Sequence, residues 1–211
     1  MIVKIWRIVA VTLVTTLSGC GFYGESAQFA SDGENIVMTG VVDGRALPKF
    51  QQVLSNNPEA QTLILQYIPG SMDDDANLEL SKMVHASGLT TIVPADGMVA
   101  SGGTDLLAAG KRRIALPGAC IGVHSWAYVG LFGNDTPGTS LPRDHEEHRK
   151  YENFYRSIGI PSEFYWFTMN AAPPEDIHWM RSDEMNRYRI TSRTLGDGWD
   201  QVSTEESCDL R

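Results

Sequence analysis

The sequence predicts an α/β domain made of repeated βα units around a mainly parallel sheet. Short apolar or β-branched runs alternate with segments of helical spacing from residue 36 to residue 123, which is the pattern of parallel sheets. Length also favours one domain, because the 192 residues after residue 19 can bury a sizeable core but are few for two domains. We therefore expect one folded body over residues 35–194.

The first 19 residues have the layout of an export signal. Lys4 and Arg7 precede an apolar run over residues 8–17, and small residues follow it, as in a secretory signal peptide. The run is far shorter than the ~20 residues that cross a bilayer. We therefore predict a signal peptide over residues 1–19 rather than a membrane-spanning helix.

The step Leu17-Ser18-Gly19-Cys20 resembles the lipobox of bacterial lipoproteins. The resemblance implies cleavage before Cys20, lipidation of its thiol, and a lipid-anchored protein of the bacterial cell envelope that faces the periplasm. Gly21, where inner-membrane lipoproteins carry Asp, favours the outer membrane. The alternative is an ordinary secretory signal followed by a chance cysteine.

The mature chain begins with a tether and is strongly acidic. Residues 20–34 are small and polar, which is typical of a linker between a lipid anchor and a folded body. Loss of Lys4 and Arg7 leaves 15 basic against 26 acidic residues, a net charge of −11. Such a surface repels nucleic acid and anionic headgroups. We therefore exclude nucleic acid as a partner. We also expect the protein to be attached to the membrane by its lipid anchor alone, without contacts between its surface and lipid headgroups.

The elements of the first half alternate. Residues 36–42 are rich in β-formers, residues 47–54 have helical spacing, and residues 62–68 form a short apolar run. A helical pattern follows over residues 76–86, and a β-branched run over residues 89–93. This order predicts strand, helix, strand, helix and strand.

A Gly-rich passage at residues 97–103 opens the second half and leads into helix formers at residues 104–109. Two short apolar runs, at residues 114–116 and 119–123, predict further strands. Residues 130–142 are rich in Gly, Pro, Asn and Asp, which indicates a long loop.

Beyond this loop, residues 143–158 are charged with helical spacing, and residues 162–170 are aromatic and helical. We expect these two segments to form a helical arm over about residues 143–170. Residues 195–211 read as an irregular C-terminal tail.

Three segments carry candidate chemistry. Residues 68–71 (Ile-Pro-Gly-Ser) follow a strand, residues 100–103 (Ala-Ser-Gly-Gly) open a helix, and residues 116–117 (Leu-Pro) precede the strand that ends in Gly-Val-His at residues 122–124. In this order and spacing they resemble the Clp protease proteolytic subunit and the signal peptide peptidase family. The resemblance covers about residues 36–124, with weaker agreement to residue 191, and implies a ClpP/crotonase-like fold and serine peptidase activity.

The same residues make chemical sense on their own. A serine hydroxyl needs a base as it attacks, and histidine has a suitable pKa, so Ser101 would be the nucleophile and His124 the base. Ser101 starts a helix, where free N–H groups and the dipole favour negative charge. The N–H groups of Gly102 and Gly70 would form the oxyanion hole. The alternatives are a helix-capping serine and a structural histidine.

The third member of a triad is less well defined. Counting back along the family pattern leads to Pro173, which cannot orient a histidine. Asp176 is the first choice, and Glu175 is the second. A displaced or missing acid would impair catalysis without abolishing it.

Two cysteines remain after lipidation of Cys20. An oxidising periplasm allows Cys120 and Cys208 to pair, but spacing along the sequence does not fix the distance between their Cα atoms. A disulfide and two unpaired thiols are equally compatible with the sequence.

No motif calls for a metal or another cofactor. Asp73, Asp74 and Asp75 lack the ligand pattern of an EF-hand and suit a solvated helix start. His145 and His148 are three residues apart rather than four, so the segment is not an HExxH zinc motif and suits a charged, exposed helix face. The aromatic residues 164–167 suit packing of the arm rather than ligand binding.

These observations favour a lipid-anchored periplasmic serine hydrolase that acts on a peptide or protein. The alternative is a catalytically inactive relative that binds protein or envelope components through the same cleft or the arm. Acyl-thioester chemistry, as in crotonases, fits less well because those enzymes use no Ser-His pair at this spacing. Related enzymes form rings, so self-association is also expected.

Overall fold

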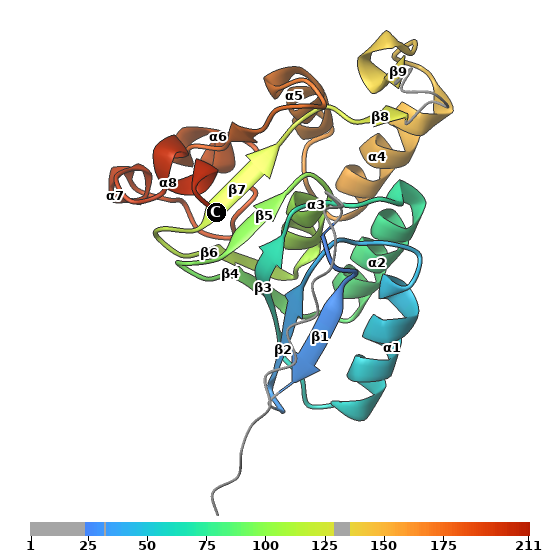
Figure 1. Cartoon of the computed structure of the whole chain (residues 1–211), viewed down its shortest axis with the longest axis vertical. Coiled ribbons are helices and arrows are strands. Elements are labelled where there is room, and N and C mark those ends of the chain that lie inside the picture. The colour runs from blue at the N-terminus through green and yellow to red at the C-terminus, as the bar shows by residue number, and fades with distance from the viewer. Residues whose placement is uncertain (1–23, 32, 129–135) are drawn as a thin grey trace, which may run out of the picture.

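The computed structural model of the chain describes residues 24–31, 33–128 and 136–211. A central eight-stranded sheet, mostly parallel, is flanked by helices (Figure 1). The predicted signal peptide and the lipidation site Cys20 lie outside the described residues. This mixed α/β architecture with a mainly parallel sheet confirms the predicted class.

The sheet runs in the order β1-β2-β3-β5-β7-β10, and β4 and β6 branch from β3. The outer strands β1 and β10 are antiparallel to their neighbours, and the remaining pairs are parallel. A separate hairpin consists of β8 and β9. The strand bounds are β1 (Gln28–Ser31), β2 (Asn35–Thr39), β3 (Thr62–Ile68), β4 (Thr90–Val93), β5 (Met98–Ala100), β6 (Arg112–Ala115), β7 (Cys120–Val123), β8 (Ala127–Tyr128), β9 (Thr136–Pro137) and β10 (His178–Trp179).

The branch at β3 determines which loops meet. The first half of β3 pairs with β4, whereas Tyr67 and Ile68 near its end pair with β5. In turn, β5 pairs with β7. Because these three strands are parallel, their carboxyl ends lie at one edge of the sheet, which is where α/β folds place their sites.

Three helices pack in a row against the sheet: α1 (Ala46–Asn56), α2 (Asp74–Ala86) and α3 (Gly102–Ala109). Figure 1 shows α1 and α2 on the same side of the sheet. Every residue of α3 is buried, including the polar Thr104 and Asp105, because this helix packs between α2 and the sheet. None of the helices in the described ranges is long and apolar enough to cross a membrane.

The N-terminal part of the body differs from the sequence prediction. Residues 28–31, expected within the tether, form β1 and pair with β2, and Ala27 is fully buried. A four-residue edge strand with only one partly buried side chain, Phe29, has no apolar run that would reveal it. Ordered structure therefore begins before the expected start at Asn35.

The helical arm is confirmed as α4 (Glu146–Ser157) and α5 (Glu163–Ala171). Tyr151 and Tyr155, four residues apart, lie on the buried face of α4. Within the predicted loop at residues 130–142, β9 and the short 3-10 helix η2 (Gly138–Ser140) are formed, and residues 129–135 lie outside the described residues.

The tail expected to be irregular contains short helices. These are α7 (Asp197–Asp200) and α8 (Glu205–Asp209), and they follow α6 (Ser182–Arg187). A capping box starts α8, and Asp200 at the end of α7 accepts hydrogen bonds from the N–H and the hydroxyl of Ser182, the first residue of α6. Helices this short carry too few periodic residues to be recognised in a sequence.

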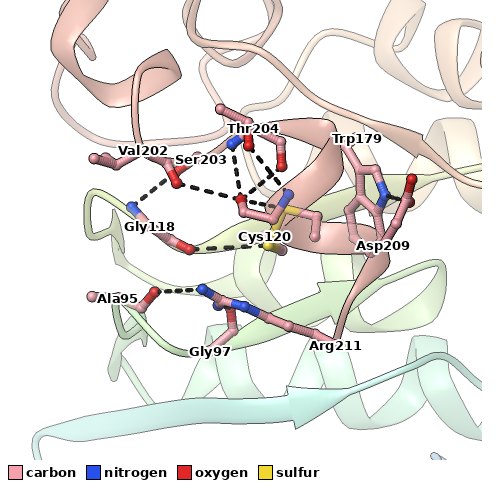
Figure 2. The surroundings of a disulfide bond; sticks show 12 residues. Ala95, Gly97, Gly118, Cys120, Trp179, Val202, Ser203, Thr204, Asp209 and Arg211 are labelled. Atoms are coloured by element: carbon pink, nitrogen blue, oxygen red, sulfur yellow. Dashed lines mark hydrogen bonds between the residues drawn. A yellow bond between two sulfur atoms is a disulfide. The ribbon is translucent and has the colours of Figure 1, made fainter.

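A disulfide joins Cys120 on β7 to Cys208 on α8, with a Cα–Cα distance of 5.6 Å (Figure 2). Hydrogen bonds also hold the tail: for example, the Trp179 indole N–H donates to Asp209 at 2.7 Å, and the Arg211 guanidinium donates to the Gly97 carbonyl at 2.9 Å. The pairing left open by the sequence is therefore present, and it anchors the C-terminus beside β5 and β7.

Candidate active site

Ser101 occupies a strained turn between β5 and α3. Its backbone has φ 52° and ψ −125°, and a positive φ at a non-glycine residue costs on the order of 1–3 kcal/mol. The position would suit a helix cap, yet the hydroxyl makes no capping hydrogen bond. The strain presents the hydroxyl at the end of the strand, as nucleophilic serines at strand-to-helix turns require.

The neighbouring strand β7 holds this turn in place. The Gly122 carbonyl accepts hydrogen bonds from the Ser101 N–H at 3.1 Å and from the Thr104 hydroxyl at 2.7 Å. Ala100 is the register partner of Gly122, and His124 follows Gly122 by two residues. Adjacent strand ends therefore bring Ser101 and His124 to one cavity, which both line.

His124 is half-buried, and burial is the main influence on its ring, lowering the pKa below 6.5. The carbonyls of Pro174 and Pro173 and the charge of Asp74 oppose this shift and raise the pKa. The Nδ1 atom is buried and makes no hydrogen bond of normal geometry with the described residues. The imidazole is thus favoured in its neutral form, which can accept a proton.

The structure does not bring Asp176 to His124. Asp176 is exposed, does not line the cavity, and accepts a hydrogen bond from the N–H of Ile177 at 2.8 Å. Glu175 is exposed and also lies outside the cavity lining. The proline carbonyls are present where the sequence suggested a carboxylate, because residues 173–174 reach the ring before the chain turns away into β10. Neither acid is therefore placed to orient the base.

The two glycines expected in the oxyanion hole lie next to the nucleophile. A Cβ on Gly70 would be 3.3 Å from the Ser101 Cβ and 3.7 Å from its Oγ, and Gly70 has φ 148°, a conformation that favours glycine. Gly102 is the first residue of α3, where a helix leaves its N–H groups without intrahelical acceptors. Both backbones are therefore close enough to approach a bound carbonyl.

The helix α3 is seated directly on the turn after β3. A Cβ on Gly103 would stand 2.5 Å from the Ile68 carbonyl oxygen, and a Cβ on Gly102 would stand 2.8 Å from the Ser71 hydroxyl. Side chains at either position would displace the helix. The Gly-Gly pair is thus needed to bring the nucleophile against the loop that carries Gly70.

Most of the cavity wall was not identified from the sequence. The cavity encloses about 40 Å³, room for a few water molecules or the end of one side chain. Besides Ser101, Gly102, Val123 and His124, the lining residues are Ser71, Asp74, Thr104, Asp105, Trp126, Tyr151, Tyr155, Tyr165 and Thr168. The spacing of the tyrosines on α4 predicts a buried face, but no local pattern tells a cavity wall from a core.

Asp105 forms the floor with two neutral partners. It is 6% exposed; Tyr155 donates a hydrogen bond to one carboxyl oxygen, and Asn77 donates to the other at 2.9 Å. Burial raises the pKa of Asp105 to about 7, although the Tyr155 hydroxyl acts in the opposite direction. At neutral pH this carboxyl exists in both protonation states.

The arm contributes Tyr165 to the cavity wall, and His148 contacts the hydroxyl of Tyr165. Trp126 donates to the Tyr165 hydroxyl at 3.0 Å, and that hydroxyl lies 2.5 Å from His148 Nδ1. An indole N–H can only donate, so the Tyr165 oxygen is the acceptor from Trp126, whereas either Tyr165 or His148 can be the donor in the second bond, depending on the tautomer of the ring. His148 is fully buried, so the expectation of an exposed face at this position is wrong: aromatic rings enclose the imidazole.

The acidic and histidine-rich segments form no metal centre in the part of the chain that the structure describes, where no three Asp, Glu, His or Cys side chains cluster suitably. Asp73 instead caps α2 by accepting the Ala76 N–H, and Asp75 pairs with Lys150 at 2.9 Å. This placement agrees with the predicted helix start. Asp74 departs from it, because its carboxylate lines the cavity.

No model of a known protein family matches the sequence, and no curated protein does. Among solved structures, a serine-to-alanine variant of the 1510-N membrane-bound stomatin-specific protease is similar with a TM-score of 0.53 and 14% identity, over 74% of this chain and 75% of that one. A lysine-to-alanine variant of that protease in complex with a substrate peptide gives 0.54 and 15%, over 74% and 71%. This likeness confirms a ClpP/crotonase-like fold.

Proposed function

We propose that this protein is a serine hydrolase, a ClpP-like peptidase in which Ser101 is the nucleophile and His124 the general base. One observation carries the proposal: Ser101 and the half-buried His124 line the same cavity. Ser101 lies in a strained turn, and its hydroxyl makes no hydrogen bond that caps α3. Peptide as the substrate class is supported by the fold neighbour, a protease whose structure holds a substrate peptide.

In the acylation step, Ser101 Oγ forms a bond to the substrate carbonyl carbon while His124 takes the hydroxyl proton. The carbonyl π electrons move to oxygen, and the N–H groups of Gly70 and Gly102 stabilise that charge. The intermediate then collapses, the C–N bond breaks, and the leaving amine takes the proton from His124. An acyl ester on Ser101 remains.

In the deacylation step, water replaces the amine. His124 removes a proton from the water molecule while the water oxygen bonds to the acyl carbon. The new tetrahedral intermediate then expels the Ser101 oxygen, which regains a proton from His124. His124 is protonated once in each of the two steps. Its ring lies near the carbonyls of Pro174 and Pro173 and near Asp74, all of which raise the pKa of His124. These groups would perform part of the work of a triad carboxylate.

Turnover of acyl substrates tests the proposal. The chain from Gly21 onward is assayed with p-nitrophenyl acetate and a quenched fluorescent peptide library. Ser101→Ala and His124→Ala should each lower kcat/KM by roughly 10³ or more. Ser55→Ala and His145→Ala, which change the same residue types outside the cavity lining, should have no effect. Equal activity of Ser101→Ala and the unmodified protein would refute the assignment.

A binding module is the second candidate, and a specific observation favours it. No carboxylate among the described residues hydrogen-bonds to His124, and its Nδ1 atom has no such partner. A site without an orienting acid could hold a peptide without cleaving it. Absence of turnover, together with saturable binding of peptides to Ser101→Ala and unmodified protein alike, would establish this function.

Lipid anchoring at Cys20 and a periplasmic, outer-membrane location belong to the same proposal and are supported by the signal layout of residues 1–20. The test is fractionation of cells that express the full chain, with incorporation of labelled palmitate. The unmodified protein should label and sediment with outer membranes, whereas Cys20→Ala should do neither. Self-association can be measured by sedimentation of the soluble chain.

A further inference from the structure

The carboxylate of Asp74 is part of the candidate site. Asp74 is half-buried and lines the same cavity as Ser101 and His124. It accepts a hydrogen bond from the Ser71 hydroxyl at 2.8 Å, and that hydroxyl is 2.8 Å from where a Cβ on Gly102 would stand. One small side chain therefore separates this charge from the residue that follows the nucleophile.

No cation in the described residues offsets this charge. Asp74 takes part in no ion pair there, whereas the nearby Lys150 is engaged by Asp75 at 2.9 Å and by Glu147 at 3.0 Å. Of the described residues that line the cavity, His124 is the sole basic one. Burial is the main cause that raises the pKa of Tyr151, and the charge of Asp74 raises it further. Among the described residues, the Asp74 carboxylate is thus stabilised by the N-terminus of α2 and by the Ser71 hydroxyl, but by no paired cation.

Aromatic side chains form the rest of the wall. Tyr151, Tyr155, Tyr165 and Trp126 line the same cavity as Asp74, and the rings of Tyr151 and Tyr165 are stacked on each other. Aromatic faces attract ammonium and guanidinium groups, and do so more strongly where water is excluded. A carboxylate among aromatic rings, with about 40 Å³ of space, suits the charged end of a basic side chain.

The proposed reaction itself favours such a substrate. The tetrahedral intermediate places negative charge at Gly70 and Gly102, and the Asp74 carboxylate opposes that charge through space. A cation held by Asp74 neutralises it and strengthens the oxyanion site during the reaction. The cation thus contributes to transition-state stabilisation as well as to binding.

We infer that Asp74 is a specificity-determining residue, and that the cavity takes substrates with a lysine or arginine side chain beside the carbonyl attacked by Ser101. This inference rests on the proposed hydrolase function of the same site.

Matched esters test it. Thiobenzyl esters of N-benzoyl-lysine and N-benzoyl-norleucine differ in the terminal ammonium. The unmodified protein should hydrolyse the lysine ester with a kcat/KM at least tenfold higher. Asp74→Asn should remove the preference, with Asp74→Ser as a second variant, and Asp75→Asn should retain it because Asp75 lies outside the cavity lining. Equal hydrolysis of both esters by the unmodified protein, or a preference that survives in Asp74→Asn, would overturn the inference.

A binding measurement separates this inference from the proposed function. Calorimetry with Ser101→Ala compares a lysine peptide with its norleucine counterpart. At least tenfold tighter binding of the lysine peptide, lost when Asp74→Asn is added, supports the cation site even if the protein hydrolyses nothing. If the protein hydrolyses both esters equally and binds both peptides equally, the proposed hydrolase function is supported and the inference about Asp74 is refuted.

Discussion

At the scale of single residues, Ser101 and His124 owe their placement to backbone rather than to side-chain contacts. The Gly122 carbonyl fixes the Ser101 N–H, and the carbonyls of Pro174 and Pro173 face the His124 ring. A turn with a positive φ at Ser101 is maintained only because the packed strands and α3 over-determine it. The site is therefore built before a substrate arrives.

The pH dependence of activity follows from the environment of His124. Burial lowers its pKa below 6.5, and the base acts only when neutral. Activity should be complete near pH 7 and should fall with decreasing pH through a midpoint below 6.5. A profile of kcat/KM against pH measures this. Because Asp74 raises the pKa of His124, Asp74→Asn should shift the midpoint further down, and a shift upward would contradict the assignment.

Asp105 predicts a pH dependence of stability. Burial raises its pKa from 3.8 to about 7, so the folded state holds the proton more tightly than the unfolded chain. Asp105 therefore contributes to the free energy of unfolding fully below pH 4, and this contribution is lost as the pH rises through about 7. Between pH 5 and pH 8 the unfolding free energy should fall by roughly 2–3 kcal/mol for this reason.

Urea unfolding at pH 5 and pH 8 measures the effect of Asp105. Asp105→Asn should reduce the difference in unfolding free energy between the two pH values, whereas Asp197→Asn, at an exposed position, should leave it unchanged. An unaltered difference in Asp105→Asn would show that this carboxyl titrates normally.

The sequence reveals those site residues that belong to a local motif. Ser101 and His124 directly follow β5 and β7, and Gly70 and Gly102 lie two residues after β3 and β5, so the order of strands and short motifs is enough to identify them. Asp74 and Tyr155 come from separate helices, and their meeting depends on how α2, α3 and α4 pack. Side chains that converge through tertiary packing leave no signature in a single sequence.

At the scale of elements, apolar runs with clear ends were predicted well. The run at residues 62–68 coincides with β3, and α1 and α2 lie within two residues of their expected ends. The sequence does not distinguish β5 from the Gly-rich passage around it, because this strand has only three residues and is followed by Ser and Gly. Its pairing with β3 and β7 supplies the stability that local propensity does not.

The contact between α3 and β3 predicts the effect of a single methyl group. In Gly103→Ala, the added Cβ would stand 2.5 Å from the Ile68 carbonyl oxygen, so α3 must move. We expect a loss of roughly 1–3 kcal/mol in unfolding free energy and a large loss of activity. Gly198→Ala on α7, where nothing lies within 4 Å, is the control and should be neutral. Normal stability of Gly103→Ala would mean that α3 is less tightly seated.

At the scale of the whole molecule, the tail holds the strands that carry the site. Cys208 lies in a small cluster with Cys120 and with Met98 and Ala100 of β5, the strand that leads into Ser101. The predicted class and fold were confirmed because alternation of elements is a global pattern. The short helices of the tail are too brief to give a periodic pattern, whereas the disulfide that anchors them, between residues 88 positions apart, is one of the two alternatives that the sequence leaves open.

Removal of this link should destabilise the protein. A bridge that closes 88 residues restricts the unfolded chain, and its loss typically costs about 2–5 kcal/mol. Thermal and urea unfolding of Cys120→Ser/Cys208→Ser should show this loss. Adding reductant should lower the stability of the unmodified protein to that level and leave the double variant unchanged. A reductant effect on the double variant would point to another cause.

Covalent labelling by a fluorophosphonate tests the central claim most directly. The reagent reacts with serines that a base activates, and tandem mass spectrometry identifies the modified residue. We predict one adduct, on Ser101, that is lost in Ser101→Ala and forms far more slowly in His124→Ala. Correctly folded protein that forms no adduct, or that carries it on Ser71 or another serine, would contradict the assignment of Ser101 and His124 as a hydrolytic pair.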